Sequence, residues 1–366
     1  MIDFIPSYLY TDLFNYFIFV LIIVVAFECF SDNLFKPEVK AMNNVVAYIV
    51  AIVVILYMGL RPVSPYFGDT VVYAESFYKL QMNVHQYRIL AEGEWVFNAL
   101  MFWFAKYSNI HMFFLFCSAI YVGALWWAFK RIFEEDFFIP FIIAMGMFTF
   151  WSYGVNGIRN GMAASIIILA LSFRQKIPVM VLLVFLGLGI HKTMYLLLAA
   201  AALTWFVKDS KLYLGIWVGC ILVSLVAGNS IANILASSNL IGDDRFANYI
   251  SGNNTEDTFS HTGFRWDFLL YSAIPVAVGY YLIFKEQYTD KFYIWIYNIY
   301  LMTNAFWIIV IRASFSNRFA QISWFLIPLV LVYPFFMKKF WNDQPVKIGY
   351  IVIISYLYTF YLVFLD

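Results

Sequence analysis

The stretch AMNNVVAYIVAIVVILYMGL, residues 41–60, carries no charged side chain and is long enough to cross a lipid bilayer as one helix. A similar run, LFNYFIFVLIIVVAFECF, occupies residues 13–30, and comparable runs continue to residue 365. Of the 366 residues, 63% are hydrophobic and 12% are charged, whereas about a quarter are charged in an ordinary soluble domain. No water-soluble fold of this length can bury so much apolar surface. The sequence therefore predicts an all-α, polytopic transmembrane helical bundle.

The apolar runs set the number of membrane crossings, because about 20 apolar residues span the hydrocarbon core. This criterion predicts about twelve spans and one integral membrane domain over residues 1–366. The run at 95–107 is too short for a span, so we expect an interfacial or re-entrant helix there. The twelve predicted spans lie near 13–30, 41–60, 110–129, 137–153, 157–173, 177–190, 193–207, 212–229, 267–284, 292–311, 318–337 and 348–365.

The run at 177–190 is short because His191-Lys192-Thr193 interrupts it. A broken helix at membrane depth is tolerated only where protein or a water-filled cavity receives the freed backbone groups. We therefore expect a cavity beside His191.

Basic residues divide between the two ends of the predicted spans. Thirteen of them, eleven Lys and two Arg, fall on one side, which the positive-inside rule makes the cytoplasm. The thirteen are Lys36, Lys40, Lys130, Arg131, Arg174, Lys176, Lys208, Lys211, Lys285, Lys291, Lys338, Lys339 and Lys347.

The ten basic residues at the outer ends comprise seven Arg and three Lys. Topology needs only positive charge, whereas a guanidinium offers a fixed fork of donors that matches phosphate or carboxylate. The arginine bias therefore favours anion recognition at the outer face, with pairing to acids of the outer loops as the alternative. The ten are Arg61, Lys79, Arg88, Lys106, Arg159, Lys192, Arg245, Arg265, Arg312 and Arg318.

Two long polar connections, 61–94 and 229–266, face outward in this topology. Both mix polar side chains with aromatic rings, a combination that suits carbohydrate, although membrane proteins also place Tyr and Trp at the bilayer surface. A third segment, Tyr153 to Gly161, places Asn156, Arg159 and Asn160 at the start of an apolar helix, where free N–H groups favour an anion. In the alternative, Asn156 caps this helix and Arg159 reaches the lipid headgroups.

Composition excludes some functions. The net charge of +1 gives no field for nucleic acid, and no partner of that kind is expected. Cys29, Cys117 and Cys220 lie inside apolar runs without metal-ligand spacing, so we expect lipid- or core-facing thiols rather than a disulfide set or a zinc site. No dense carboxylate cluster is evident, and Asp243-Asp244 is the one candidate for a divalent metal.

Several short motifs occur in a fixed order: Arg61 before Phe67-Gly68-Asp69-Thr70 and Tyr73, Glu94 in Gly-Glu-Trp, Asn156-Gly-Ile-Arg159-Asn-Gly, His191-Lys-Thr, and Arg312-Ala-Ser-Phe-Ser-Asn-Arg318. Together they span about residues 55–335 and resemble the EpsG-like family of Wzy-type bacterial polysaccharide polymerases, which make O-antigen, capsule or exopolysaccharide.

The resemblance implies a metal-independent glycosyltransferase without a cofactor, in the bacterial plasma (inner) membrane. Its active site would face the periplasm or the cell exterior. A polyprenyl-diphosphate-linked oligosaccharide, such as an undecaprenyl diphosphate, would serve as donor and as acceptor, with membrane lipids and a chain-length regulator as further partners. The alternatives are an O-antigen-type ligase and a flippase or transporter of lipid-linked oligosaccharide. The sequence shows no internal repeat of the kind that transporters carry.

This chemistry assigns candidate roles. Arg159, Arg265, Arg312 and Arg318 are expected to stabilise the diphosphate leaving group. The acceptor hydroxyl needs a base, and His191 is a candidate because an imidazole exchanges protons near neutral pH. Asp69 and Glu94 are rival bases, and each could instead pair with Arg61 or Arg88. The predicted substrate-binding residues are Arg61, Tyr73, Arg88, Asn156, Asn160, Lys192, Arg265, Arg312 and Arg318.

Overall fold

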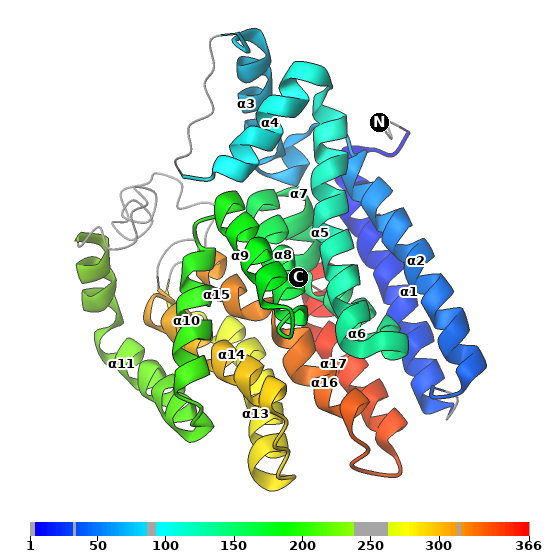
Figure 1. Cartoon of the computed structure of the whole chain (residues 1–366), viewed down its shortest axis with the longest axis vertical. Coiled ribbons are helices and arrows are strands. Elements are labelled where there is room, and N and C mark those ends of the chain that lie inside the picture. Colours follow the sequence, from blue (N-terminus) through cyan, green and yellow to red (C-terminus); the bar gives the residue numbers. More distant parts are fainter. Residues whose placement is uncertain (1–3, 32–33, 86–92, 238–262, 313–315, 366) are drawn as a thin grey trace. The chain divides into compact units, whose positions relative to one another are not determined.

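The computed structural model describes residues 4–31, 34–85, 93–237, 263–312 and 316–365. Every regular element in these ranges is a helix (Figure 1), which confirms the predicted all-α class. The chain forms two compact units. Unit 1 comprises Met1–Met194 and Phe335–Asp366, and unit 2 comprises Tyr195–Pro334. The single domain expected from the sequence stays a prediction.

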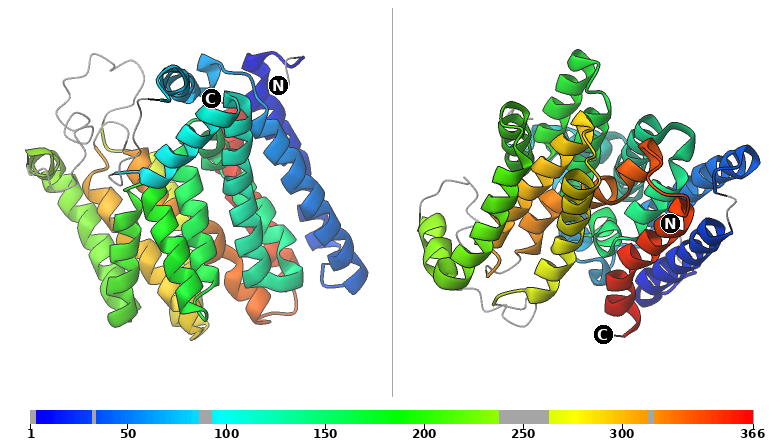
Figure 2. Two further views of the ribbon diagram at one scale, coloured as in Figure 1. Left: turned by 45° about the horizontal axis from the view of Figure 1, so that its top comes forward. Right: turned by 90° about the horizontal axis from the view of Figure 1, so that it is seen from below.

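Unit 1 is built around long helices that run side by side (Figures 1 and 2). Helix α1 packs on α17 and on α6, α2 packs on α5, and α5 packs on α8, which in turn packs on α9. Helices α3 and α4 lie at the end of the unit where α1 begins (Figure 1). The helices of unit 1 are α1 (Tyr10–Phe30), α2 (Pro37–Gly59), α3 (Thr70–Met82), α4 (Trp95–Tyr107), α5 (Ile110–Phe133), α6 (Phe138–Gly146), α7 (Phe148–Val155), α8 (Ile158–Ser172), α9 (Ile177–Ile190) and α17 (Gln344–Phe364).

Unit 2 packs α11 and α15 against α14, with α13 also on α14. Helix α13 contains Pro275 and continues into a π-helical turn, Tyr281–Lys285. Its helices are α10 (Met194–Phe206), α11 (Ser210–Ser237), α13 (Trp266–Tyr280), α14 (Lys291–Ile309), α15 (Asn317–Trp324) and α16 (Ile327–Met337), of which α10 and α16 cross the boundaries of the unit.

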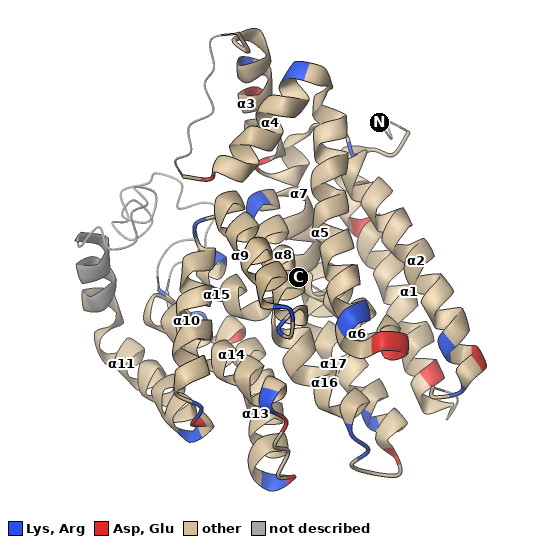
Figure 3. Cartoon of the chain, in the orientation of Figure 1, with Lys and Arg blue, Asp and Glu red and all other residues tan. Residues whose placement is uncertain are grey.

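Eight helical segments of the described residues are long and apolar enough to span a membrane, and α6 with α7 forms a further candidate that is bent by 75°. Helices α8, α9 and α10 coincide with the three remaining predicted spans, but each is shorter than the helices that can span a membrane alone. Figure 3 shows charged residues mainly toward helix ends and connections. The chain is a polytopic helical membrane protein.

Local sequence explains where several helices begin. Asn109 caps α5 by accepting a hydrogen bond from the backbone N–H of Met112 at 3.1 Å, and Asp290 caps α14 in the same way at Tyr293, at 2.8 Å. Prolines open α2, α9 and α17, where a missing N–H costs nothing.

Two segments differ from the sequence-based expectations. The connection 61–94 was expected as a polar loop, yet residues 70–82 within it form α3, which buries Tyr73 and Phe77. The stretch 137–153 was expected as one span. Instead, the backbone is extended at Met147, where ψ is 136°, and this residue separates α6 from α7. Cys29 and Cys117 are buried and Cys220 is half-buried, all as free thiols, as predicted.

Candidate active site

Three helix ends meet in unit 1 and bring three charged or titratable side chains together. Glu94 immediately precedes α4, Arg159 lies in the first turn of α8, and His191 follows the last residue of α9. One carboxylate oxygen of Glu94 accepts a hydrogen bond from Nη1 of Arg159, and the other contacts Nδ1 of His191. Residues far apart in the sequence thus form one ionic cluster, the Arg159–Glu94–His191 cluster.

The cluster is partly shielded from solvent. The side chain of Glu94 is 15% exposed, that of His191 18% and that of Arg159 24%. Such values leave each group within reach of a ligand, while the surroundings strengthen their electrostatic interactions relative to bulk water.

Aromatic rings line the Arg159 side of the cluster. Nε of Arg159 donates a hydrogen bond to the Tyr73 hydroxyl at 3.3 Å. The guanidinium also lies 5.7 Å from the ring centroids of Tyr73 and Phe97, close enough for cation–π attraction. Phe97 packs in turn on Phe113 of α5, with their ring centroids 5.6 Å apart. These contacts hold the guanidinium in one place.

The surroundings control the charge of Glu94. Burial alone would raise the pKa of its carboxyl group, but the hydrogen bond with His191 and the charge and hydrogen bond of Arg159 outweigh burial. The pKa of Glu94 therefore lies below its ordinary value of 4.5, and the group is a carboxylate at neutral pH. For Tyr73, burial raises the pKa of the phenol, so the hydroxyl keeps its proton.

Two nitrogen atoms of the cluster remain available. Within the described residues, Nη2 of Arg159 and Nε2 of His191 make no hydrogen bond. An imidazole whose Nδ1 donates to a carboxylate presents its other nitrogen as a proton acceptor. A free guanidinium amino group can donate to a phosphate oxygen. The cluster therefore combines a candidate base with a candidate anion ligand.

Asn156 connects the start of α3 to the end of α7. Its side-chain oxygen accepts a hydrogen bond from the backbone N–H of Asp69 at 2.8 Å. Gly68 makes this approach possible, because its φ is +56° and a Cβ there would lie 2.6 Å from Cγ of Asn156. The alternative in which Asn156 caps the N-terminus of α8 is wrong, because Gly157 is the N-cap residue of α8 and no side chain makes a capping hydrogen bond there.

Arg61 lies beneath this junction and is fully buried. It donates hydrogen bonds to the backbone oxygens of Met58 at 2.6 Å and Val155 at 3.0 Å, and to the Thr70 hydroxyl at 3.0 Å. The alternative pairing of Arg61 with Asp69 or Glu94 is therefore not observed. Arg61 joins the ends of α2 and α7 to the start of α3, a position that supports the site.

The His191-Lys192-Thr193 segment separates α9 from α10, as the sequence predicted. The Thr193 hydroxyl donates to the side-chain oxygen of Asn160, a buried residue of α8, at 3.3 Å. Lys192 is exposed beside the start of α4, where a Cβ on Gly93 would lie 3.9 Å from its amino nitrogen. The cavity expected beside His191 stays a prediction.

Gly189 was not predicted, although it permits the contact between α9 and α4. A Cβ at this position would lie 2.4 Å from Val96 and 2.8 Å from the ring of Trp95. The signal in the sequence was the pair of glycines in Gly187-Leu-Gly189, which Ile190 separates from His191.

Three further predicted arginines, Arg265, Arg312 and Arg318, belong to the second unit. Arg265 forms an ion pair with Asp267 and stacks on Phe268, with its guanidinium 3.6 Å from the ring centroid. Arg312 lies 5.5 Å from the Phe264 ring centroid, and Arg318 lies in the first turn of α15. These three arginines belong to unit 2, so a shared anion site with Arg159 stays a prediction. Arg88 and Asp243-Asp244 lie outside the described residues.

No group of three or more His, Cys, Asp or Glu side chains in the described part of the chain is arranged to hold a metal ion. Independence from metal stays a prediction.

The fold and the cluster define a class: a polytopic helical membrane protein in which a carboxylate contacts a guanidinium and an imidazole where three helix ends of unit 1 meet. The family model of the EpsG family matches residues 44–366, and the chain belongs to the EpsG family. Membership indicates a polysaccharide-polymerase-like function and glycosyltransferase-like chemistry in general. No curated protein and no solved structure gave a match.

Proposed function

We propose that this protein is a polysaccharide polymerase that transfers a growing glycan from a polyprenyl diphosphate carrier onto a new lipid-linked repeat unit. The observation that carries the proposal is the contact of one carboxylate, Glu94, with both Arg159 and His191. Family membership supports the reaction class, and the cluster supports the assignment of roles.

In the proposed reaction, a hydroxyl oxygen of the acceptor sugar forms a bond to the anomeric carbon of the donor glycan. The bond between that carbon and the phosphate oxygen breaks, and its electron pair leaves with the lipid diphosphate. Nε2 of His191 takes the hydroxyl proton as general base. Glu94 holds the imidazole through Nδ1 and stabilises the imidazolium that forms.

Arg159 stabilises the leaving group in this scheme. Its Nη2 is the free donor of the cluster, and its remaining contacts with Glu94 and Tyr73 fix the direction of the fork. A guanidinium held in place before the reaction requires no reorganisation when negative charge develops on the diphosphate. Lys192, exposed beside α4, adds a second cation near the same end of the unit.

Asp69 was a rival candidate for the base. We assign it instead the binding of sugar hydroxyls. Its backbone N–H is bound by Asn156, and its side chain makes no hydrogen bond at the N-cap of α3. A half-buried carboxylate beside Tyr73 can accept hydrogen bonds from a carbohydrate.

The active site is proposed to face the outside of the bacterial plasma membrane, where polyprenyl-linked sugars are polymerised. The lysine-rich connections support this orientation through the positive-inside rule. The helices of Figure 1 support the membrane location itself.

The test is reconstitution in nanodiscs with a matched polyprenyl-diphosphate-linked repeat unit, with and without EDTA. A product ladder spaced by one repeat unit is expected in both conditions. Lys176→Gln, an exposed lysine on the connection between α8 and α9, is the matched control and should give the wild-type ladder. Absence of a ladder, together with movement of the lipid across liposome membranes, would indicate a flippase, and transfer of one finished glycan to another acceptor would indicate a ligase.

A further inference from the structure

A cavity of about 370 Å³ lies in unit 1 at the turn between α16 and α17. Phe35 just before α2, Lys40 in the first turn of α2 and Asp136 after the end of α5 form its other side. One part of the lining is apolar, with Phe35, Phe336, Met337 and Pro345, and another part carries Lys40, Lys338 and Lys339. The volume is within the range of small-molecule sites.

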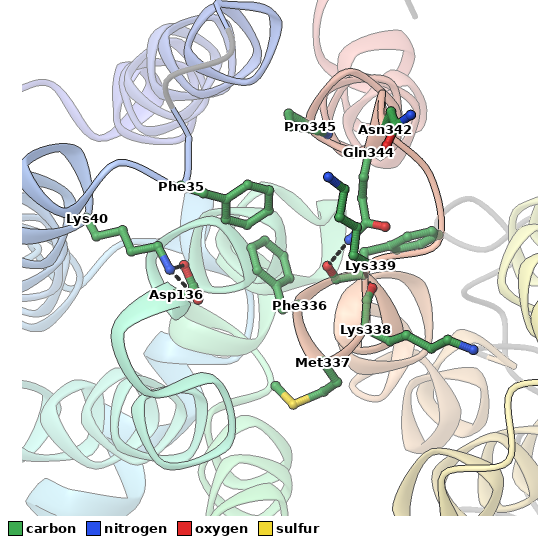
Figure 4. Close-up of a pocket in the computed structure, with 11 residues that line it drawn as sticks. Phe35, Lys40, Asp136, Phe336, Met337, Lys338, Lys339, Asn342, Gln344 and Pro345 are labelled. Carbon is green, nitrogen blue, oxygen red and sulfur yellow. Dashed lines mark hydrogen bonds and ion pairs between the residues drawn. The ribbon is translucent and has the colours of Figure 1, made fainter.

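The charge of the lining favours an anion. Three lysines and one aspartate line the cavity, which gives a formal surplus of two positive charges. The aspartate, Asp136, already binds Lys40 at 2.7 Å. Within the described residues, Lys338 and Lys339 form no ion pair. In Figure 4 the rings of Phe35 and Phe336 lie between the Lys40–Asp136 pair and the turn that carries the other two lysines.

The turn itself is fixed. The buried side chain of Gln344 accepts a hydrogen bond from the backbone N–H of Phe340 at 2.7 Å and donates to the backbone oxygens of Phe335 at 2.5 Å and Lys338 at 3.0 Å. These bonds connect both ends of the turn, so the backbone that presents Lys338 and Lys339 is held without any ligand.

The same turn has the composition of a segment at the depth of lipid headgroups. Phe340 and Trp341 pack on each other with ring centroids 5.3 Å apart, and Lys338 and Lys347 lie over their rings at 5.0 and 3.8 Å. Aromatic side chains and lysines gather at this depth in membrane proteins. Topology explains the lysines alone, but it does not explain a cavity that is apolar on one side and cationic on the other.

We propose that this cavity binds the phosphate group of an anionic phospholipid, with the acyl chains along Phe35, Phe336 and Met337. Basic pockets between membrane helices on the cytoplasmic side bind the headgroups of anionic lipids. The proposal is independent of the polymerase activity, because Asp136, Lys338 and Lys339 belong to no part of the Arg159–Glu94–His191 cluster.

The test measures the melting temperature of the delipidated protein in a neutral detergent against increasing short-chain phosphatidylglycerol. Phosphatidylcholine with the same chains and inorganic phosphate serve as the comparison ligands. Phosphatidylglycerol is expected to raise the melting temperature at concentrations where the other two do not. In the variant Lys338→Gln with Lys339→Gln, the apparent Kd should rise about tenfold or more, since each lysine near a lipid surface contributes about 1 kcal/mol.

The matched control is Lys208→Gln with Lys211→Gln, which removes one exposed lysine from the connection between α10 and α11 and one from the first turn of α11. Lys208 also lies beside a tryptophan, Trp205. This control should bind phosphatidylglycerol like the wild type. Equal stabilisation by phosphatidylcholine or by inorganic phosphate, an unchanged Kd in the Lys338/Lys339 variant, or an equal loss in the control would each overturn the proposal.

Discussion

At the scale of single residues, Glu94 is the centre of the site, because among the described residues it is the carboxylate that contacts both Arg159 and His191. The sequence indicated all three residues, since their motifs resemble those of the EpsG-like family and their side chains suit glycan transfer. It left Glu94, Asp69 and His191 as rival bases, because separations of 65 and 97 residues carry no distance information. The structure supplies the geometry that makes Glu94 the partner of His191.

Replacing Glu94 by Gln should lower the polymerisation rate by about a thousandfold. An amide keeps the shape of the side chain but cannot stabilise an imidazolium or balance the charge of Arg159. The measurement is the initial rate of ladder formation in nanodiscs. A rate within a few-fold of the wild type would remove Glu94 from the mechanism.

Replacing Arg159 by Lys should reduce turnover by about a hundredfold while the protein stays folded. The ammonium group keeps the charge but loses the fork that reaches Tyr73, Glu94 and a phosphate at the same time. Single-turnover cleavage of the lipid-linked donor measures the effect. Retained turnover in this variant would show that the diphosphate binds elsewhere.

The lowered pKa of Glu94 predicts how stability changes with pH. In the folded state the carboxyl group has a lower pKa than the ordinary 4.5 of the unfolded chain, so ionisation stabilises the fold above that pH. The stabilisation is lost as pH falls through the folded-state pKa. The melting temperatures of wild type and Glu94→Gln, followed from about pH 7 to about pH 3, should therefore differ at neutral pH and converge in acid. A difference that grows in acid would contradict this assignment.

At the scale of helices, the sequence predicted most of the places where helices form, but it did not predict where a helix bends. Each of the twelve predicted spans falls on helical structure, because lipid-exposed backbone has to satisfy its own hydrogen bonds. Three of these helices, α8, α9 and α10, are shorter than a full span, and the stretch 137–153 is divided into α6 and α7. Helix α3 was missed because its apolar residues are interspersed with Glu75, Ser76 and Lys79 in a polar connection. The bend at Met147 depends on packing, which no local pattern reveals.

Substituting Gly189 by Ala tests whether the approach of α9 to α4 positions His191 against Glu94. The added methyl would overlap Val96 and Trp95, and such overpacking costs about 1–3 kcal/mol. We expect a lower melting temperature and an activity reduced about tenfold or more. Gly123→Ala in α5 is the control, because a Cβ there meets nothing within 4 Å. Equal effects of the two substitutions would argue against a positioning role for Gly189.

At the scale of the whole molecule, charge distribution predicts the orientation in the membrane. The lysine-rich connections should lie in the cytoplasm, and the Arg159–Glu94–His191 cluster should lie near the outer face. The family match over residues 44–366 covers every residue of the cluster, all of unit 2 and unit 1 from residue 44 onward. The sequence could not show that residues 1–194 and 335–366 form one unit, because this association depends on the contact of α17 with α1.

Single cysteines introduced at Lys192 and at Lys176 test the orientation in a background without the three native cysteines. Both positions are exposed in the structure. A membrane-impermeant maleimide added to intact cells should label Lys192→Cys and should label Lys176→Cys only after permeabilisation. The opposite pattern would place the cluster on the cytoplasmic side.

The most direct test of the central claim, that His191 held by Glu94 is the base for glycan transfer, uses the variant His191→Ala. Binding of the polyprenyl-diphosphate-linked repeat unit and formation of the product ladder are measured on the same nanodisc preparation. The account predicts binding close to that of the wild type and a ladder reduced by about a thousandfold or more. A ladder formed at the wild-type rate would contradict it.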